Sequence, residues 1–530
     1  MEIETLCKSS TFCARAPWRH PCHHGGRKFR ADGMGCGSVL RPLRICAFTA
    51  LILSRRSQAR RCLPAIETFE EEDQEGIDDT DEGDEEGRRS FENCVGSYAW
   101  LWETQDFDWT SLAGRSERQS KTTVALIIGY LGHKFVGLQQ PCQQGLGRTD
   151  FVRAVETELE LALFKAGAMI PENFGNLCRL RWSRVGRTDA GVSASCNVVS
   201  GRLIVGKDPE SLEELVQRIR SFLPADLAIH GAAFVSKRFS ARREGCRRAY
   251  EFLVPSFCVA PTRAKTRTWL AARRPDVMPT DFTVEDLKLL EEELKLREVR
   301  LSAEQLKRFR RALAAFEGTH FFGNFANKKL DPRGPQGYRH VRRFHCGDPW
   351  VDEDGREWLT LEICADSFLT HQIRKMVATA ALVAQGALSM EFIDAAMHRR
   401  LDVKTQRFPP NGLIFVRPSF KAKTITGKPS TVEAALESEE VLTRTAEMQE
   451  SLKKAIIKEA EEGLSAVYWL ACVTHYEPED MESEVLAEYR KFMPRNEQYI
   501  KARQAASTQV TCIIASQGAQ LWLGRNPRPR

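Results

Sequence analysis

The sequence lacks any pair of cysteines spaced C-x-x-C, although it contains 16 cysteines in 530 residues. Cysteines scattered in this way exclude a disulfide-rich secreted scaffold and a zinc ribbon, and they fit a protein of a reducing compartment. The densest group of potential metal ligands is formed by His20, Cys22, His23 and His24. Its spacing matches no standard zinc site, so we predict no bound metal.

The amino-terminal region also lacks a long hydrophobic run and has few acidic residues. Its longest apolar run, residues 45–53, is interrupted by Thr49 and is much shorter than the roughly 20 residues that span a bilayer. Only Glu2, Glu4 and Asp32 accompany 12 lysines and arginines up to residue 62. Such a leader is typical of an organellar transit peptide, and an unstructured basic tail or a mispredicted leader explains it equally well. We expect a soluble protein, with the nucleus and an organelle (mitochondrion or plastid) both open as its compartment.

The net charge of +6 hides an uneven distribution of charge along the chain. Residues 67–86 hold 13 acidic residues in 20 and cannot bury enough apolar surface to fold. The overall composition, 42% hydrophobic and 28% charged, is typical of a soluble globular protein of about two to four domains. We therefore predict a basic leader at 1–66, an acidic disordered linker at 67–120 and a folded region that begins at Lys121.

Strand and helix patterns alternate in the first half of the folded region. Residues 122–130 are rich in β-forming residues, which predicts a strand, and residues 150–166 carry a helical apolar spacing with Thr149 as the expected cap. Further strands are predicted at 194–205, 227–234 and 247–254, and a helix after Asp208-Pro209. This alternation predicts a mixed α/β fold.

The second half of the folded region is less regular. Residues 259–279 are rich in Pro and Arg, which indicates an irregular connection, and residues 283–316 indicate one or two charged helices. Asp354-Gly355 lies between two strand-like segments and is a strong hairpin signal. Beyond Arg417, helical composition at 430–462 and an apolar segment at 467–473 predict a helix and a strand. The last 25 residues are ambiguous, and we assign no chemistry to this extension.

One short polar turn, Gly-Arg-Thr-Asp-Ala-Gly-Val at 186–192, lies between two strand-like segments. An acid two residues after an arginine, bracketed by glycines, can present one carboxylate beside one fixed cation. Taken alone, the pattern is also typical of an ordinary turn with a solvated ion pair, which is the commoner case. The neighbouring segments therefore decide its interpretation.

This turn resembles the GRTDxGV signature of the TruA-type tRNA pseudouridine synthases. Other segments resemble further blocks of that family, in the family order: F-x-A-R at 239–242, an arginine-and-tyrosine strand at 247–254, G-T-H-x-F-x-N-F at 318–325, F-L-x-H-Q-I-R-K-M-V at 368–377 and a final segment at 408–416. The resemblance extends over residues 121–418, so it is far more specific than a single motif. Residues 165–167, 170–173 and 371–377 look most like the eukaryotic multi-site enzymes, whereas Ala190 is typical of the bacterial branch.

The resemblance implies a pseudouridine synthase fold of the α/β (α+β) class. In that fold two similar subdomains share a mixed, largely antiparallel sheet with a central cleft. We place an amino-terminal catalytic subdomain at 121–258 and a carboxy-terminal catalytic subdomain at 259–418. Residues 419–530 then form a carboxy-terminal extension of unknown role.

The resemblance also assigns roles to individual residues. Asp189 corresponds to the essential catalytic aspartate, Tyr250 to the active-site tyrosine, and Arg374 to a second arginine that would hold and aim the carboxylate of Asp189. A strand tyrosine taken alone is more often half-buried core than a catalytic group. For RNA binding the candidates are Arg187, which would help to hold the target base out of the stack, and the phosphate-binding arginines Arg242, Arg247 and Arg248.

The implied reaction is the isomerisation of uridine to pseudouridine in tRNA with base flipping, and it needs no cofactor. The expected partner is tRNA, or another structured RNA, with no membrane and no obligatory protein partner. Two other classes stay open: a catalytically inactive RNA-binding protein or chaperone, and a glycosidase-like hydrolase that releases uracil from RNA. Which uridines are modified, and whether the carboxylate attacks the sugar or removes a sugar proton, is not decided by the sequence.

Overall fold

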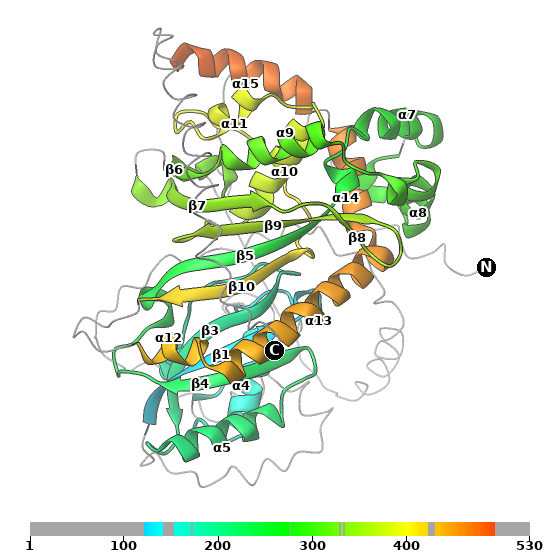
Figure 1. Cartoon of the computed structure of the whole chain (residues 1–530). Helices are drawn as coiled ribbons and strands as arrows, with labels where there is room; N and C mark the ends of the chain where they lie inside the picture. The colour runs from blue at the N-terminus through cyan, green and yellow to red at the C-terminus, as the bar shows by residue number, and fades with distance from the viewer. Residues whose placement is uncertain are drawn as a thin grey trace, which may run out of the picture. The chain divides into compact units, whose positions relative to one another are not determined.

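Figure 1 shows the computed structural model of the chain, which describes residues 121–140, 153–170, 173–275, 277–327, 330–331, 334–421, 430–476 and 478–492. The predictions for the basic leader, the acidic tract, the cap at Thr149 and the last 25 residues lie outside these ranges. Among the helices within them, none is long and apolar enough to cross a membrane.

The described strands form one mixed sheet of ten strands. Its order is β4 (Leu227–Phe234), β1 (Lys121–Tyr130), β3 (Ser193–Ile204), β10 (Leu413–Phe420), β5 (Gly245–Pro255), β9 (Glu357–Ala365), β7 (Tyr338–Cys346) and β6 (Gly318–Phe321). Two short strands lie off this path: β2 (Ser183–Arg184) pairs with β3, and β8 (Trp350–Val351) pairs with β9. The pairing of β3 with β10 is parallel and the other described pairs are antiparallel. The prediction of a mixed, largely antiparallel α/β fold is confirmed.

Strand β10 is the last of the described strands in the sequence but occupies the middle of the sheet. Its residue Phe415 lies opposite Ala194 of β3 on one side and opposite Tyr250 of β5 on the other. The turn at 186–192 leads directly into β3. The insertion of β10 therefore brings that turn and Tyr250 to the same region of the molecule.

Helix α5 shows how local sequence sets an element. Asp208 caps the helix by accepting a hydrogen bond from the backbone N–H of Ser211 over 2.8 Å, and Pro209 occupies the first turn, as predicted. The described α-helices are α4 (Val155–Lys165), α5 (Pro209–Arg220), α6 (Ala241–Glu244), α7 (Arg263–Arg273), α8 (Val284–Glu293), α9 (Ala303–Ala314), α10 (Gln372–Ala384), α11 (Met390–Ala396), α12 (Thr431–Leu436), α13 (Glu439–Gly463), α14 (Ser465–His475) and α15 (Pro478–Phe492).

Two predicted segments differ from the structure. The strand predicted at 467–473 is wrong, because these residues belong to helix α14. The helix packs against α7 and α8 and buries Val467, Leu470 and Val473, and a short apolar run does not distinguish such a buried helix from a buried strand. The connection predicted at 259–279 contains helix α7, whose sequence carries mostly Arg, Lys and Thr. That helix is held by contacts from distant residues, such as the hydrogen bonds from Arg263 to the carboxylate of Glu479.

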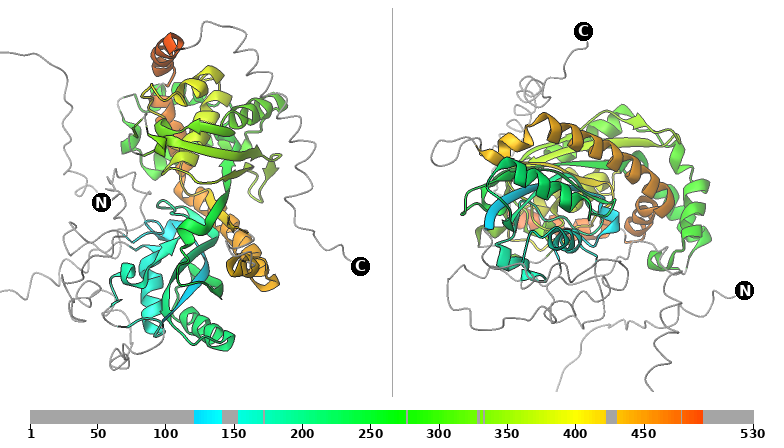
Figure 2. Two further views of the ribbon diagram at one scale, coloured as in Figure 1. Left: turned by 90° about the vertical axis from the view of Figure 1, so that its left-hand side faces the viewer. Right: turned by 90° about the horizontal axis from the view of Figure 1, so that it is seen from below.

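Helix α13 runs across one face of the sheet, as Figures 1 and 2 show in orange. Its residues Leu452, Ile456 and Ala460, spaced by four, pack in one buried cluster with Leu253, Trp358 and Ile414 from three central strands. The alternation of side chains along β5 sends Leu253 toward α13 and Tyr250 toward the opposite face. The carboxy-terminal extension thus covers the back of the sheet behind Tyr250.

A buried cluster of charges lies at one end of α13. Arg356, 1% exposed, contacts the carboxylates of Glu291 on α8 and Glu461 on α13 at 2.6 and 2.8 Å. Arg297 contacts the same two acids from the outside, with Nε 3.6 Å from Glu291 Oε2. Burial raises the pKa of Glu291, and Arg356 acts against that shift. This cluster joins α13 of the extension to helix α8.

Candidate active site

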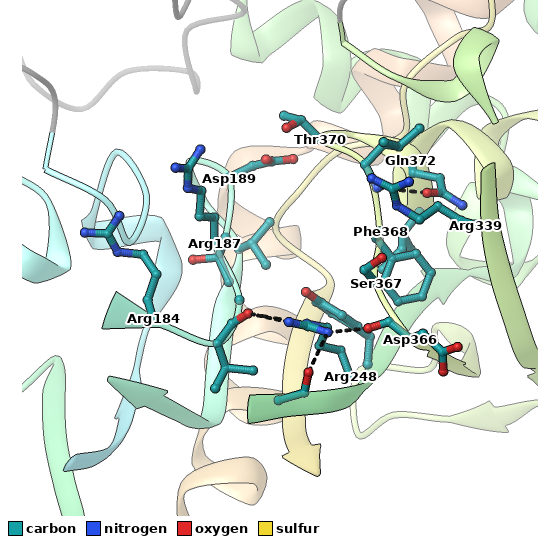
Figure 3. Close-up of a pocket in the computed structure, with 18 of the residues that line it drawn as sticks. Arg184, Arg187, Asp189, Arg248, Arg339, Asp366, Ser367, Phe368, Thr370 and Gln372 are labelled. Atoms are coloured by element: carbon teal, nitrogen blue, oxygen red, sulfur yellow. Dashed lines mark hydrogen bonds between the residues drawn. The ribbon is translucent and has the colours of Figure 1, made fainter. Parts of the chain in front are cut away.

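A cavity of about 920 Å³ opens where the turn at 186–192, strand β5 and the loop before α10 meet. Its lining includes the catalytic candidates Asp189, Tyr250 and Arg374 and the RNA-binding candidates Arg187, Arg242, Arg247 and Arg248. Figure 3 shows part of this lining, with Arg187 and Asp189 on one wall and Phe368, Thr370 and Gln372 on the other. The structure therefore brings all seven predicted site residues, which are spread over 188 positions of sequence from Arg187 to Arg374, into one cavity.

Buried polar side chains of strands β1 and β3 form hydrogen bonds to the turn that carries Asp189. The hydroxyl of Tyr130 on β1 is hydrogen bonded to Thr188 Oγ1 over 2.8 Å, and Asn197 Nδ2 on β3 donates to the carbonyl of Gly186 over 3.0 Å. From the side, the N–H of Leu138 donates to the carbonyl of Thr188. Burial raises the pKa of Tyr130 to about 12, so its hydroxyl stays a neutral partner. These bonds fix the backbone on which the Asp189 side chain stands.

Gly191 closes the turn and cannot easily be replaced. Its φ of 80° lies in the left-handed region, and a Cβ there would come within 3.0 Å of Asn411 Oδ1. Asn411 in turn donates to a carboxylate oxygen of Glu459 on α13. The carboxy-terminal extension therefore supports the turn from behind through Asn411.

The carboxylate of Asp189 faces a fixed cation. Its side chain is 23% exposed, and its Oδ2 lies 3.5 Å from Nη1 of Arg374. Arg374 lies in the first turn of α10, and its Nε donates to the carbonyl of Phe408 over 2.7 Å. Burial lowers the pKa of Arg374 and the nearby Asp189 acts against that shift. One guanidinium is thus anchored at the backbone and aimed at one oxygen of the carboxylate.

Tyr250 lies in the wall of the cavity with its ring largely buried, at 8% exposure. The ring packs edge-on against Phe368 at 5.4 Å between centroids and tilted against Phe415 at 4.8 Å. Burial raises the pKa of its hydroxyl well above the usual value. The residue is therefore a rigid, neutral aromatic group at the cavity, which suits a stacking surface better than a proton carrier.

The four predicted RNA-binding arginines divide into two kinds. Arg187, Arg242 and Arg247 are exposed at the cavity. Arg248 is less exposed than these three arginines. Its Nη2 donates to the carbonyl of Val185 over 3.0 Å, and its Nη1 donates to the carbonyl of Asp366. Burial lowers its pKa, and Figure 3 shows it bridging the two walls. These bonds connect the two walls of the cavity through Arg248, and its role in binding phosphate stays a prediction.

The sequence assigned no role to His371, which the structure places at Asp189. Its Nε2 lies 3.7 Å from Asp189 Oδ2, and its backbone takes a positive φ of 66° at the amino-terminal end of α10. Arg407 approaches the other ring nitrogen. The signal available in the sequence was the position of His371 three residues before Arg374 in the same block. The positive φ that turns its ring toward Asp189 could not be predicted from the sequence.

Comparison with known proteins yields a consistent set of similarities. The model of a family described as tRNA pseudouridine synthase matches residues 312–421. Pseudouridylate synthase 1 homolog of Mus musculus is 28% identical over 333 residues, which are 62% of this chain and 68% of that protein. tRNA pseudouridine synthase 1 of Yarrowia lipolytica is 26% identical over 356 residues, 57% of this chain and 64% of that protein. Pseudouridylate synthase 1 homolog of Homo sapiens is 28% identical over 299 residues, 56% of this chain and 60% of that protein. The chain thus spans between 60% and 68% of the length of these relatives.

Proposed function

We propose that this chain is a TruA-type tRNA pseudouridine synthase that isomerises uridine to pseudouridine in tRNA, as its similarity to proteins of that family supports. The observation that carries this proposal is the pairing of Asp189 with Arg374 in the wall of an open, arginine-lined cavity. A lone surface aspartate would not be held in this way. The relatives named as tRNA pseudouridine synthases support the choice of tRNA as the substrate.

The reaction moves one base without any net oxidation or reduction. The bond between C1′ of the ribose and N1 of the uracil breaks, the uracil turns, and its C5 bonds to C1′. The proton on C5 then leaves, and N1 gains a proton. The Asp189 carboxylate assists either by attacking C1′ or by removing a proton from the sugar, and both routes pass through a positively charged sugar that a carboxylate stabilises. No cofactor is required.

The other residues of the cavity bind and orient the flipped nucleotide. The uridine must leave the RNA stack before its glycosidic bond is accessible. We assign to Tyr250 the stacking surface for the uracil, and to Arg187 the support that keeps the nucleotide out of the stack. Arg242 and Arg247 bind the phosphate backbone. Because these contacts are made to phosphates and to one base, they place a uridine at Asp189 without defining a long sequence around it.

The test is to incubate the purified chain with an unmodified tRNA transcript, without cofactor, and to map pseudouridine by carbodiimide modification and primer extension. We expect pseudouridine at one or more positions and an RNA of unchanged mass. Release of free uracil would instead identify a glycosidase-like hydrolase. Binding of tRNA without either product would identify an inactive RNA-binding protein and reject the proposal.

The two neighbouring arginines of β5 should respond differently to salt. Arg247→Gln should reduce the slope of log affinity for tRNA against log salt by about 0.7 to 0.9, as expected for the loss of one phosphate contact. Arg248→Gln should leave that slope unchanged, because its guanidinium bonds to protein carbonyls, and should slow the reaction instead. Filter binding at several salt concentrations and single-turnover kinetics measure the two effects.

Arg311→Gln is the matched control, since this exposed arginine lies in α9 outside the lining of the cavity. It should change neither the slope nor the rate. If Arg248→Gln lowers the slope as much as Arg247→Gln does, then Arg248 binds phosphate after all and its role as a link is wrong.

A further inference from the structure

His371 has two charged neighbours, one at each nitrogen of its ring. Nε2 lies 3.7 Å from Oδ2 of Asp189, and Nη1 of Arg407 lies 3.4 Å from Nδ1. The side chain is only 13% exposed, so water does not compete strongly for either nitrogen. Neither contact was expected from the sequence.

The contact with Arg407 fixes the position of the proton on the ring. A guanidinium has only donors and keeps its proton in proteins, so Nδ1 of His371 must offer its lone pair to Arg407. In a neutral imidazole one nitrogen donates and the other accepts. The proton is therefore on Nε2, the nitrogen that faces Asp189.

We propose that His371 is a positioning residue for the reaction: it donates Nε2–H to the Asp189 carboxylate, and Arg407 holds the ring in the tautomer that permits this. The inference rests on the proposed function. The separation of 3.7 Å is longer than a hydrogen bond, and such contacts commonly shorten when the substrate closes the site. With Arg374 on the same oxygen, the carboxylate is then aimed by two groups: the charged Arg374 within α10 and the neutral His371 at its N-cap.

The surroundings of His371 keep its ring neutral. Burial lowers its pKa to about 4, opposed by Asp189 and reinforced by Arg374, Arg407 and Lys375. The ring consequently does not titrate between pH 6 and 8, and its Nε2–H is present throughout that range. Arg374 and Lys375 flank the ring from α10, Arg407 from the segment before β10, and Asp189 from the turn before β3.

The positive φ of His371 provides a test variant that retains the backbone. His371→Asn replaces histidine with a residue that adopts positive φ readily, so it should melt at the same temperature as the parent. Its shorter amide can still accept from Arg407 but does not reach Asp189. His371→Gln places an amide N–H where Nε2 stood. His475→Asn, at the exposed carboxy-terminal end of α14, is the matched control.

The measurements are single-turnover pseudouridine formation, tRNA affinity and melting temperature. His371→Asn should slow the reaction by about 10- to 100-fold, the effect of losing one hydrogen bond to a charged group, with affinity unchanged within about twofold. His371→Gln should recover most of the rate. If His371→Asn reacts within about threefold of the parent, or if His371→Gln is as slow as His371→Asn, the inference is wrong. A parent chain that forms no pseudouridine would instead refute the proposed function, and the inference with it.

A second readout does not depend on activity. In protein labelled with ¹⁵N-histidine, the His371 signal, identified by its loss in His371→Gln, should show a proton on Nε2 and none on Nδ1 at pH 7. Arg407→Met should remove the donor at Nδ1 and raise the pKa of the ring, because one cation is lost. A proton on Nδ1 in the parent would overturn the assignment of the tautomer.

Discussion

Asp189→Asn is expected to bind tRNA as the parent does and to form no pseudouridine. Asparagine keeps the size of the side chain and a polar oxygen near Arg374, but it removes the charge that stabilises a positive sugar. Loss of an essential catalytic residue typically costs on the order of 10⁴-fold in rate, so product should fall to background. Nucleoside analysis of the digested tRNA measures the product, and filter binding measures the affinity.

Asp208→Asn is the matched control for this experiment. It makes the same chemical change at the amino-terminal cap of α5, where asparagine caps about as well as aspartate. Its activity and stability should equal those of the parent. If Asp189→Asn still forms pseudouridine within about tenfold of the parent rate, a barrier difference of only about 1.4 kcal/mol, Asp189 is not the catalyst.

Arg356→Met should cause the largest loss of stability among single substitutions in the described extension and its contacts. The change leaves the carboxylates of Glu291 and Glu461 buried near one another with only Arg297 beside them. Removing one partner of a buried ion cluster typically lowers the free energy of unfolding by about 3 to 5 kcal/mol. Urea denaturation followed by fluorescence measures the loss.

The loss in Arg356→Met should depend on pH. Burial already raises the pKa of Glu291 in the folded protein, and removal of Arg356 raises it further. A carboxyl whose pKa is higher in the folded than in the unfolded state favours folding at low pH and opposes it as the pH rises through the folded pKa. The deficit should therefore be largest at pH 8 and smaller at pH 5.

Two companion variants distinguish a buried charge from lost packing. Arg356→Met combined with Glu291→Gln should recover a large part of the stability, because one of the uncompensated carboxylates is gone. Lys458→Met removes an exposed ion pair from the same helix and should change stability by less than about 0.5 kcal/mol. Equal stability of Arg356→Met and the parent would show that the cluster contributes nothing.

Elements with a local signature were predictable from the sequence. Strand β4 was placed at its observed bounds by its apolar pattern, and α5 by its cap and its proline. Helix α14 was mistaken for a strand, because it is apolar on most sides where it packs between α7 and α8. The place of β10 between β3 and β5 depends on pairing between residues more than 150 positions apart, and no local pattern reports such pairing.

The site was predicted in outline and missed in its contacts. The resemblance led to Asp189, Tyr250 and Arg374, which all line the same cavity. The alternation of side chains in β5 places Arg248 on the same face as Tyr250, but only the fold shows that the carbonyls of Val185 and Asp366 lie there to receive it. Motifs identify which residues take part, and the tertiary structure decides what each one touches.

The central place of β10 has a consequence for the order of events during synthesis. Strands β3 and β5 leave the ribosome early, yet neither can complete its ladder until residues 413–420 have been made. Through the translation of the intervening chain, the start of β3 and the edge of β5 that faces β10 therefore stay unpaired, and such an edge can pair with other chains. Before β10 is made, the strands on its two sides cannot join into one sheet. A chaperone that binds the unpaired edge of β5 would protect the newly made polypeptide from pairing with other chains during this interval.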